Sequence, residues 1–131
     1  MKNDKRPINV GILDLLVFRW PIAAIASISH RVAGVGLFVG IALVLYALQM
    51  SLSSEESFNN LKAFMTSSPI GMVITIGLFA ALAFHFVAGI KHLLLDLGVG
   101  ESLEGSAFAA KVVLLFSAIL ILLAALWVIQ S

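Results

Sequence analysis

Three long stretches without a charged residue constrain what this 131-residue chain can fold into. They cover residues 32–54, 63–90 and 112–131. A helix of about 20 apolar residues, rising ~1.5 Å per residue, crosses the ~30 Å hydrocarbon layer of a bilayer. Each stretch is long enough for one crossing, so we predict an all-α integral membrane protein with three transmembrane helices.

The composition supports a membrane environment and excludes several kinds of site. The chain is 61% hydrophobic and 11% charged, whereas a soluble domain carries about 25% charged residues. A soluble fold of this length has too little interior to cover so much apolar surface. The net charge of +1 gives no nucleic-acid footprint. The chain has no cysteine, which excludes disulfides, iron–sulfur ligation and thiolate zinc sites within it.

Prolines and glycines mark where the spans begin and end. We predict a single membrane-anchor domain, residues 1–131, with spans at about 22–50, 70–97 and 108–130. Pro21 and Pro69 suit the first turn of a helix, and Gly98 suits the end of the second span. The polar segments 50–68 and 101–106 are predicted to be loops.

The segment before the first span has the pattern of a short helix lying at the membrane interface. Apolar residues recur there with helical spacing at Ile12, Leu13, Leu16 and Trp20. The residues before it are basic and polar, and they do not have the pattern of a signal peptide. No transit peptide stands out, which favours a bacterial inner membrane over a mitochondrial one.

The positive charges predict how the chain is oriented. The first span is preceded by Lys2, Lys5, Arg6 and Arg19. Lys91 and Lys111 flank the second loop, whereas Lys62 is the only lysine or arginine in the first loop. Because cytoplasmic loops carry an excess of lysine and arginine, we predict a cytoplasmic N-terminus and second loop. The first loop and the C-terminus are then periplasmic.

Two groups of polar side chains fall within the predicted spans, where polar groups are costly. The first span carries Ser27, Ser29, His30 and Arg31. The second carries His85 and His92, which point in roughly the same direction because they are seven residues apart. The two spans run in opposite directions, so we expect both groups at one depth in the cytoplasmic half. At that depth the imidazole of His85 needs a polar partner.

Ordinary structural roles also account for each of these residues taken alone. A lone histidine in a span is most often hydrogen-bonded to a neighbouring helix. Ser27 can bond back to the carbonyl of residue 23, and Arg31 can extend to the interface. Lys91, His92 and Asp96 can be cap residues at the cytoplasmic end of the second span.

Small residues around His85 leave room for a different interpretation. Ala81 and Gly89 lie one turn to either side of His85 and leave the clearance that a flat macrocycle needs. Haem iron in an apolar electron-transfer site is commonly held by axial histidines. Gly36 and Gly40 are two small residues spaced four apart, and Gly34 is nearby. Such a small-xxx-small spacing lets another helix or a flat ligand come close.

Taken together, these motifs resemble the cytochrome b556 subunits of succinate dehydrogenase, the larger of two small membrane anchors of succinate:quinone oxidoreductase. The similarity is carried by Arg6–Pro7, by the run from Ser27 to Gly34, and by the run from His85 to Leu93 with Asp96. The family usually has arginine where this chain has Lys91, which keeps the charge but loses the planar fork.

The resemblance implies a non-catalytic subunit, not an enzyme in its own right. Such a subunit packs with a second anchor into a haem-containing bundle, beneath an iron–sulfur subunit and a flavoprotein subunit. It implies that His85 is an axial ligand of a shared haem b, with the other ligand supplied by the second anchor. It also implies that Ser27 and Arg31 bind the quinone, with ubiquinone as substrate, and that His30 and Arg31 approach the haem propionates.

Two alternatives remain open at this point. An anchor of a quinol:fumarate reductase has a similar architecture but works in the opposite direction. A haem-free structural protein with three spans, in which the histidines are only hydrogen-bonded, would carry the same apolar pattern.

Overall fold

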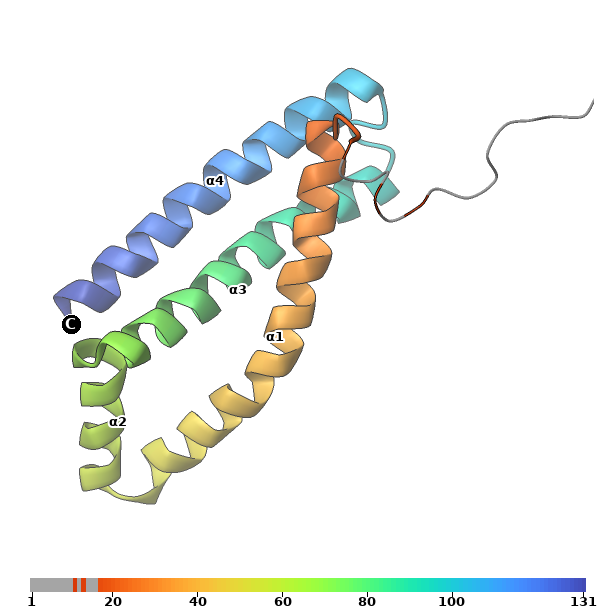
Figure 1. The fold of residues 1–131 in the computed structure, drawn as a ribbon. Coiled ribbons are helices and arrows are strands. Elements are labelled where there is room, and N and C mark those ends of the chain that lie inside the picture. Colours follow the sequence, from red (N-terminus) through yellow and green to blue (C-terminus); the bar gives the residue numbers. More distant parts are fainter. Residues whose placement is uncertain (1–10, 12, 14–16) are drawn as a thin grey trace, which may run out of the picture.

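Four helices make up the part of the chain that the computed structural model describes, which is residues 11, 13 and 17–131 (Figure 1). They are α1 (Ile22–Ser53), α2 (Glu55–Ser67), α3 (Pro69–Asp96) and α4 (Leu103–Gln130). Helices α1, α3 and α4 are each long and apolar enough to cross a membrane. The predicted all-α fold with three membrane-spanning helices is therefore confirmed. Half of the helix predicted at the interface, residues 9–20, lies outside the described residues, and the described residues 17–20 are not helical.

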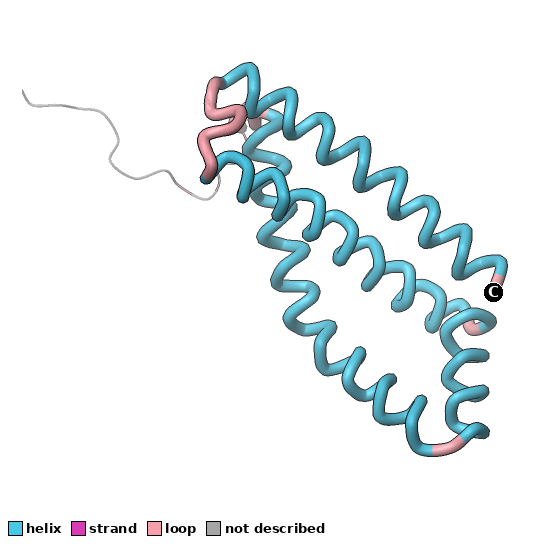
Figure 2. The backbone as a smooth tube through the Cα atoms, turned by 180° about the vertical axis from the view of Figure 1, so that it is seen from behind, coloured by secondary structure: helices cyan, strands magenta, loops and turns pink. Residues whose placement is uncertain are grey.

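The three long helices are packed as an open bundle. Helices α3 and α4 run side by side in opposite directions, and α1 crosses α3 close to the α3–α4 connection (Figure 1). From there α1 diverges from α3, and α2 closes the gap at the far end, as the view from behind also shows (Figure 2). The start of α1 and the α3–α4 connection lie at one end of the bundle, and the C-terminus lies at the other.

The segment predicted to be the first loop is helical, so that prediction is wrong. Helix α1 continues to Ser53, and α2 follows after a single residue, Ser54. The Ser54 side chain accepts a hydrogen bond from the Ser57 amide at 3.0 Å, and two glutamates occupy the first turn of α2. Both features stabilise the start of a helix. The apolar side chains of α2, Phe58, Leu61, Phe64 and Met65, recur at helical spacing.

Local capping also explains the ends of α3 and α4. Pro69 occupies the first turn of α3, and Gly98 follows the helix with a φ of +82° that favours glycine. Helix α4 begins at Leu103, so the predicted loop 101–106 is wrong for its last four residues. The Ser102 side chain accepts a hydrogen bond from the Gly105 amide at 3.0 Å and caps α4 at that point.

The outward faces of the long helices are apolar. Val32, Val35 and Phe38 on α1 are 67%, 67% and 77% exposed. A soluble protein rarely exposes a continuous apolar surface of this kind. These faces therefore suit contact with lipid or with another membrane subunit.

Candidate functional site

Three histidine rings from two helices are stacked where α1 crosses α3. The His30 ring from α1 lies against the His85 ring from α3, with centroids 4.2 Å apart and planes 21° apart. On α3 the His92 ring is tilted against the same His30 ring at 5.0 Å. The ring of His30 thus lies against both histidines of α3. The structure therefore brings His30, one member of the first polar group, against both histidines of the second group.

The polar partner of His85 is a main-chain group of α1. Its Nδ1 atom lies 3.1 Å from the carbonyl oxygen of His30. A carbonyl oxygen only accepts hydrogen bonds, so Nδ1 is the donor and carries the proton. In a neutral imidazole the other nitrogen, Nε2, then has a free lone pair. That tautomer is the one required for a metal bond through Nε2.

Gly34 lets the ring of His85 reach this carbonyl. An ideal Cβ at Gly34 would lie 2.9 Å from Cε1 and 3.3 Å from Nδ1 of His85. Contacts this short require one of the groups to move. Gly34 also follows His30 by four residues, so its amide is the helical donor to the same carbonyl. A carbonyl oxygen has two lone pairs and can accept both hydrogen bonds.

His30 has a buried nitrogen that lacks a partner. Its Nε2 atom is inaccessible to solvent and makes no hydrogen bond to any described residue. An ideal Cβ at Gly89 would lie 3.7 Å from it, which is ordinary van der Waals contact. The sequence predicts that Gly89 leaves free space beside His85. In the structure, His30 of the same chain lies next to Gly89. Leaving a buried polar atom unpaired costs about 1–3 kcal/mol, so this nitrogen calls for a polar partner.

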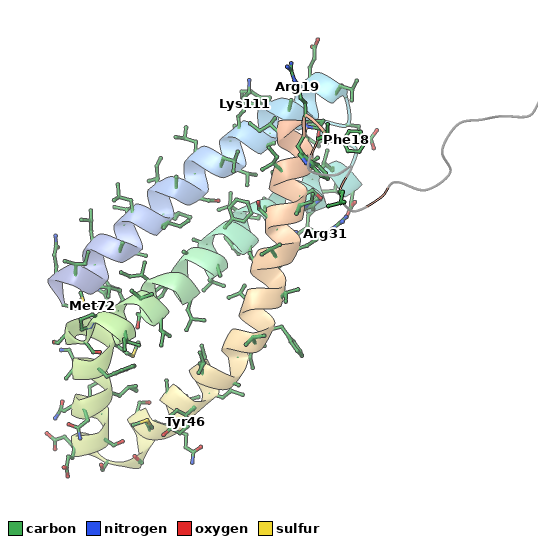
Figure 3. The ribbon with its side chains drawn as sticks, in the orientation of Figure 1. Phe18, Arg19, Arg31, Tyr46, Met72 and Lys111 are labelled. Atoms are coloured by element: carbon green, nitrogen blue, oxygen red, sulfur yellow. The ribbon has the colours of Figure 1, made fainter. Side chains whose placement is uncertain are left out.

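Ser27 and Arg31 lie one turn apart on α1 and have no partner among the described residues. Ser27 is half-buried, and its hydroxyl makes no hydrogen bond within the part of the chain that is placed. The bond back to the carbonyl of residue 23, an alternative left open by the sequence, is absent. Arg31 is exposed and forms no ion pair with a described carboxylate (Figure 3). Both polar groups are therefore available to a ligand.

The remaining polar residues at this end of α3 differ in their surroundings. Lys91 is only 6% exposed, although it lies near the C-terminal end of α3. His92 is half-buried against His30, and Asp96 is exposed at the last position of α3. These three residues therefore do not act as one exposed cap.

Comparison with known proteins places the chain in a family. A sequence profile described as succinate dehydrogenase/fumarate reductase transmembrane subunit matches residues 2–124, which is nearly the whole chain. The chain belongs to this family. It is therefore a membrane subunit of the succinate dehydrogenase/fumarate reductase type, as its motifs predict.

Individual relatives of this transmembrane subunit agree with the profile. The succinate dehydrogenase cytochrome b556 subunit of Coxiella burnetii is 41% identical over 127 residues, covering 96% of this chain and 98% of the relative. The subunit of the same name from Paracoccus denitrificans is 33% identical and covers 83% of each chain. A mitochondrial succinate dehydrogenase cytochrome b560 subunit from Sus scrofa is 28% identical, over 87% of this chain and 66% of the relative.

Two features of the site in this transmembrane subunit were missed by the sequence analysis. The first is the main-chain carbonyl of His30, because a pattern of side chains does not show which backbone groups meet. The second is the contact between Gly34 and His85. The available signal was a glycine one turn after the first histidine, opposite a second histidine at the same depth.

Proposed function

We propose that this chain is the cytochrome b membrane anchor of a succinate dehydrogenase, with His85 as an axial ligand of haem b. One observation carries the proposal. The hydrogen bond from His85 Nδ1 to the His30 carbonyl fixes the ring in the tautomer that leaves Nε2 free for iron. Histidines that ligate metals usually donate their second nitrogen in this way. The names of the relatives, which include cytochrome b556 subunits, support the same assignment.

The neighbouring residues fit a haem group. Among the described residues, the buried Nε2 of His30 has no hydrogen-bond partner and Arg31, on the same turn of α1, has no ion-pair partner. Both can hold a carboxylate, so we assign them to the haem propionates. Bound haem b supplies a one-electron redox centre in the apolar region between the anchors. The residues of this chain hold that group in place and orient its ligand.

The second axial ligand has to come from another chain. The other two histidines of this chain, His30 and His92, lie ring against ring beside His85, and we assign neither of them to the iron. The chain contains no other histidine. We therefore propose a second small anchor subunit that shares the haem and packs against the apolar outer faces of the helices.

We assign Ser27 and Arg31 to a quinone-reducing site. A quinone is apolar except for two carbonyl oxygens, so its site needs few donors in an apolar wall. The free hydroxyl of Ser27 can donate to one oxygen, and the guanidinium of Arg31 can stabilise the negative charge that develops on reduction. The expected substrate is ubiquinone, with electrons arriving from the iron–sulfur subunit and the flavoprotein subunit completing the assembly.

We place the chain in a bacterial inner membrane, and the distribution of lysine and arginine supports a cytoplasmic N-terminus. In this orientation the histidine cluster and the quinone residues lie in the cytoplasmic half, beneath the subunits that oxidise succinate. The catalytic chemistry on succinate belongs to those subunits. The anchor docks them, contributes to the quinone site and shares the haem.

A difference spectrum of the purified complex tests the haem assignment. We expect a b-type α band in the dithionite-reduced minus oxidised spectrum of the wild type, and its loss or shift in His85→Leu. His92→Leu is the matched control and should keep the band, because the ring contact of His92 is with His30. An unchanged band in His85→Leu would move the ligand elsewhere. A wild-type complex without a band would leave only the anchoring role.

A further inference from the structure

We infer that Gly34 and the main-chain carbonyl of His30 together form the positioning device that orients His85 and sets the redox potential of the haem it binds. This inference rests on the proposed role of His85 as a ligand. It goes further, because it assigns a function to a glycine and to a backbone group. Neither of them touches the iron.

Gly34 leaves the space that the His85 ring occupies. His85 Nδ1 lies 3.1 Å from the His30 carbonyl oxygen. The ring fits there because Gly34 has no side chain: an ideal Cβ would lie 2.9 Å from His85 Cε1. Any other residue at position 34 displaces the ring from its hydrogen bond or pushes α1 away from α3. Both movements lengthen the distance from Nδ1 to the carbonyl oxygen.

The acceptor of this hydrogen bond, the His30 carbonyl, is rigid. A side-chain acceptor can rotate away, whereas the His30 carbonyl is fixed within α1 by the helix itself. The carbonyl therefore holds the His85 ring at one angle and in one tautomer. A proton held on Nδ1 by an acceptor makes Nε2 a stronger electron donor to a metal. A stronger donor favours the oxidised, ferric state of the iron and lowers the midpoint potential.

The size of the expected change in the midpoint potential can be estimated from known effects on metal ligands. Loss of the partner that orients a metal ligand typically changes metal affinity or activity by 10–100-fold. A tenfold change in the preference for ferrous over ferric iron corresponds to about 59 mV for a one-electron couple. Removing the hydrogen bond weakens the donor, so the potential is expected to rise.

The test is a redox titration of the haem in the assembled, purified complex, comparing wild type with Gly34→Ala. The matched control is Gly36→Ala, because an added Cβ at Gly36 on the same helix meets nothing within 4 Å. We expect Gly34→Ala to raise the midpoint potential by about 59 mV and to change the low-spin ferric resonance that reports ligand orientation. Gly36→Ala should leave both at their wild-type values.

The outcomes separate this inference from the proposed function. A wild-type potential and resonance in Gly34→Ala would overturn the inference, while a b-type band that depends on His85 would leave the haem assignment standing. If the Gly34→Ala complex fails to assemble, a structure of the wild-type complex tests the inference instead. A cryo-electron microscopy map showing His85 Nδ1 bonded to a group other than the His30 carbonyl would overturn it, and retention of that bond would support it.

Discussion

Leu78 of α3 occupies the space into which a side chain at Gly40 of α1 would project. An ideal Cβ at Gly40 would lie 2.5 Å from Leu78 Cδ2, and Gly40 is one of the buried residues of α1. Together with the contact between Gly34 and His85, this places two glycines of α1 against side chains of α3. The two helices approach closely over this stretch before α1 diverges toward α2 (Figure 1).

We expect Gly40→Ala to destabilise the complex and Gly36→Ala to leave its stability unchanged. Overpacking a close contact typically costs about 1–3 kcal/mol. The measurement is the temperature at which half of the purified complex dissociates in detergent. In a Leu78→Ala background the cost of Gly40→Ala should disappear, because the clashing group is gone. An equal cost in both backgrounds would show that Leu78 is not the group that Gly40 accommodates.

The sequence predicts the spans of this protein because lipid selects for a property that is visible residue by residue. Uncharged stretches of sufficient length identify α1, α3 and α4 as membrane helices. The predictions fail where helix formation depends on a single cap. Segments 50–68 and 101–106 are polar enough to suggest loops, yet Ser54 and Ser102 each start a helix within them.

The site was predictable in its residues but not in its contacts. The depth and antiparallel direction of the spans bring His30 and His85 together, as the structure shows. The rotation of each helix about its axis decides which glycine faces which neighbour. For that reason the two glycines of this pair differ: Gly40 packs against α3, whereas a Cβ added at Gly36 would have no described atom within 4 Å. The roles of Ser27, Arg31 and His85 toward ligands stay predictions.

Arg31 is expected to be required for quinone reduction and dispensable for succinate oxidation. Its exposed guanidinium has no partner among the described residues, so its charge is available to a reduced quinone oxygen. We expect Arg31→Leu in the complex to lower succinate:quinone reductase activity by at least about 100-fold, the effect of losing one group that stabilises developing charge. Reduction of a soluble acceptor by succinate should stay at the wild-type rate.

Arg19→Leu is the matched control for this experiment. Arg19 is exposed and precedes α1, so the same substitution there should spare both activities. Arg31→Lys should retain part of the quinone activity, because lysine keeps the charge without the planar fork. Quinone reduction near the wild-type rate in Arg31→Leu would remove Arg31 from the site.

Ser102→Ala is expected to loosen the start of α4. The Ser102 hydroxyl accepts a hydrogen bond from the Gly105 amide, and loss of such a cap costs about 1 kcal/mol. The dissociation temperature of the complex should therefore fall. Ser53→Ala is the control, because the Ser53 hydroxyl bonds only the Met50 carbonyl at the exposed end of α1. Equal effects of the two substitutions would show that the cap contributes nothing specific.

The orientation of the chain can be tested by labelling single introduced cysteines, because the chain itself contains no cysteine and adds no label of its own. Glu56 on α2 and Glu101 between α3 and α4 are both exposed, and Figure 1 shows α2 and the α3–α4 connection near opposite ends of the bundle. We expect a membrane-impermeant thiol reagent to label Glu56→Cys in intact spheroplasts, because the first loop carries little positive charge. Glu101→Cys should be labelled only after the membrane is permeabilised, because Lys91 and Lys111 flank that loop. The reverse pattern would place the histidine cluster in the periplasmic half, away from the side where succinate is oxidised, and would contradict the proposed route of electrons to the quinone.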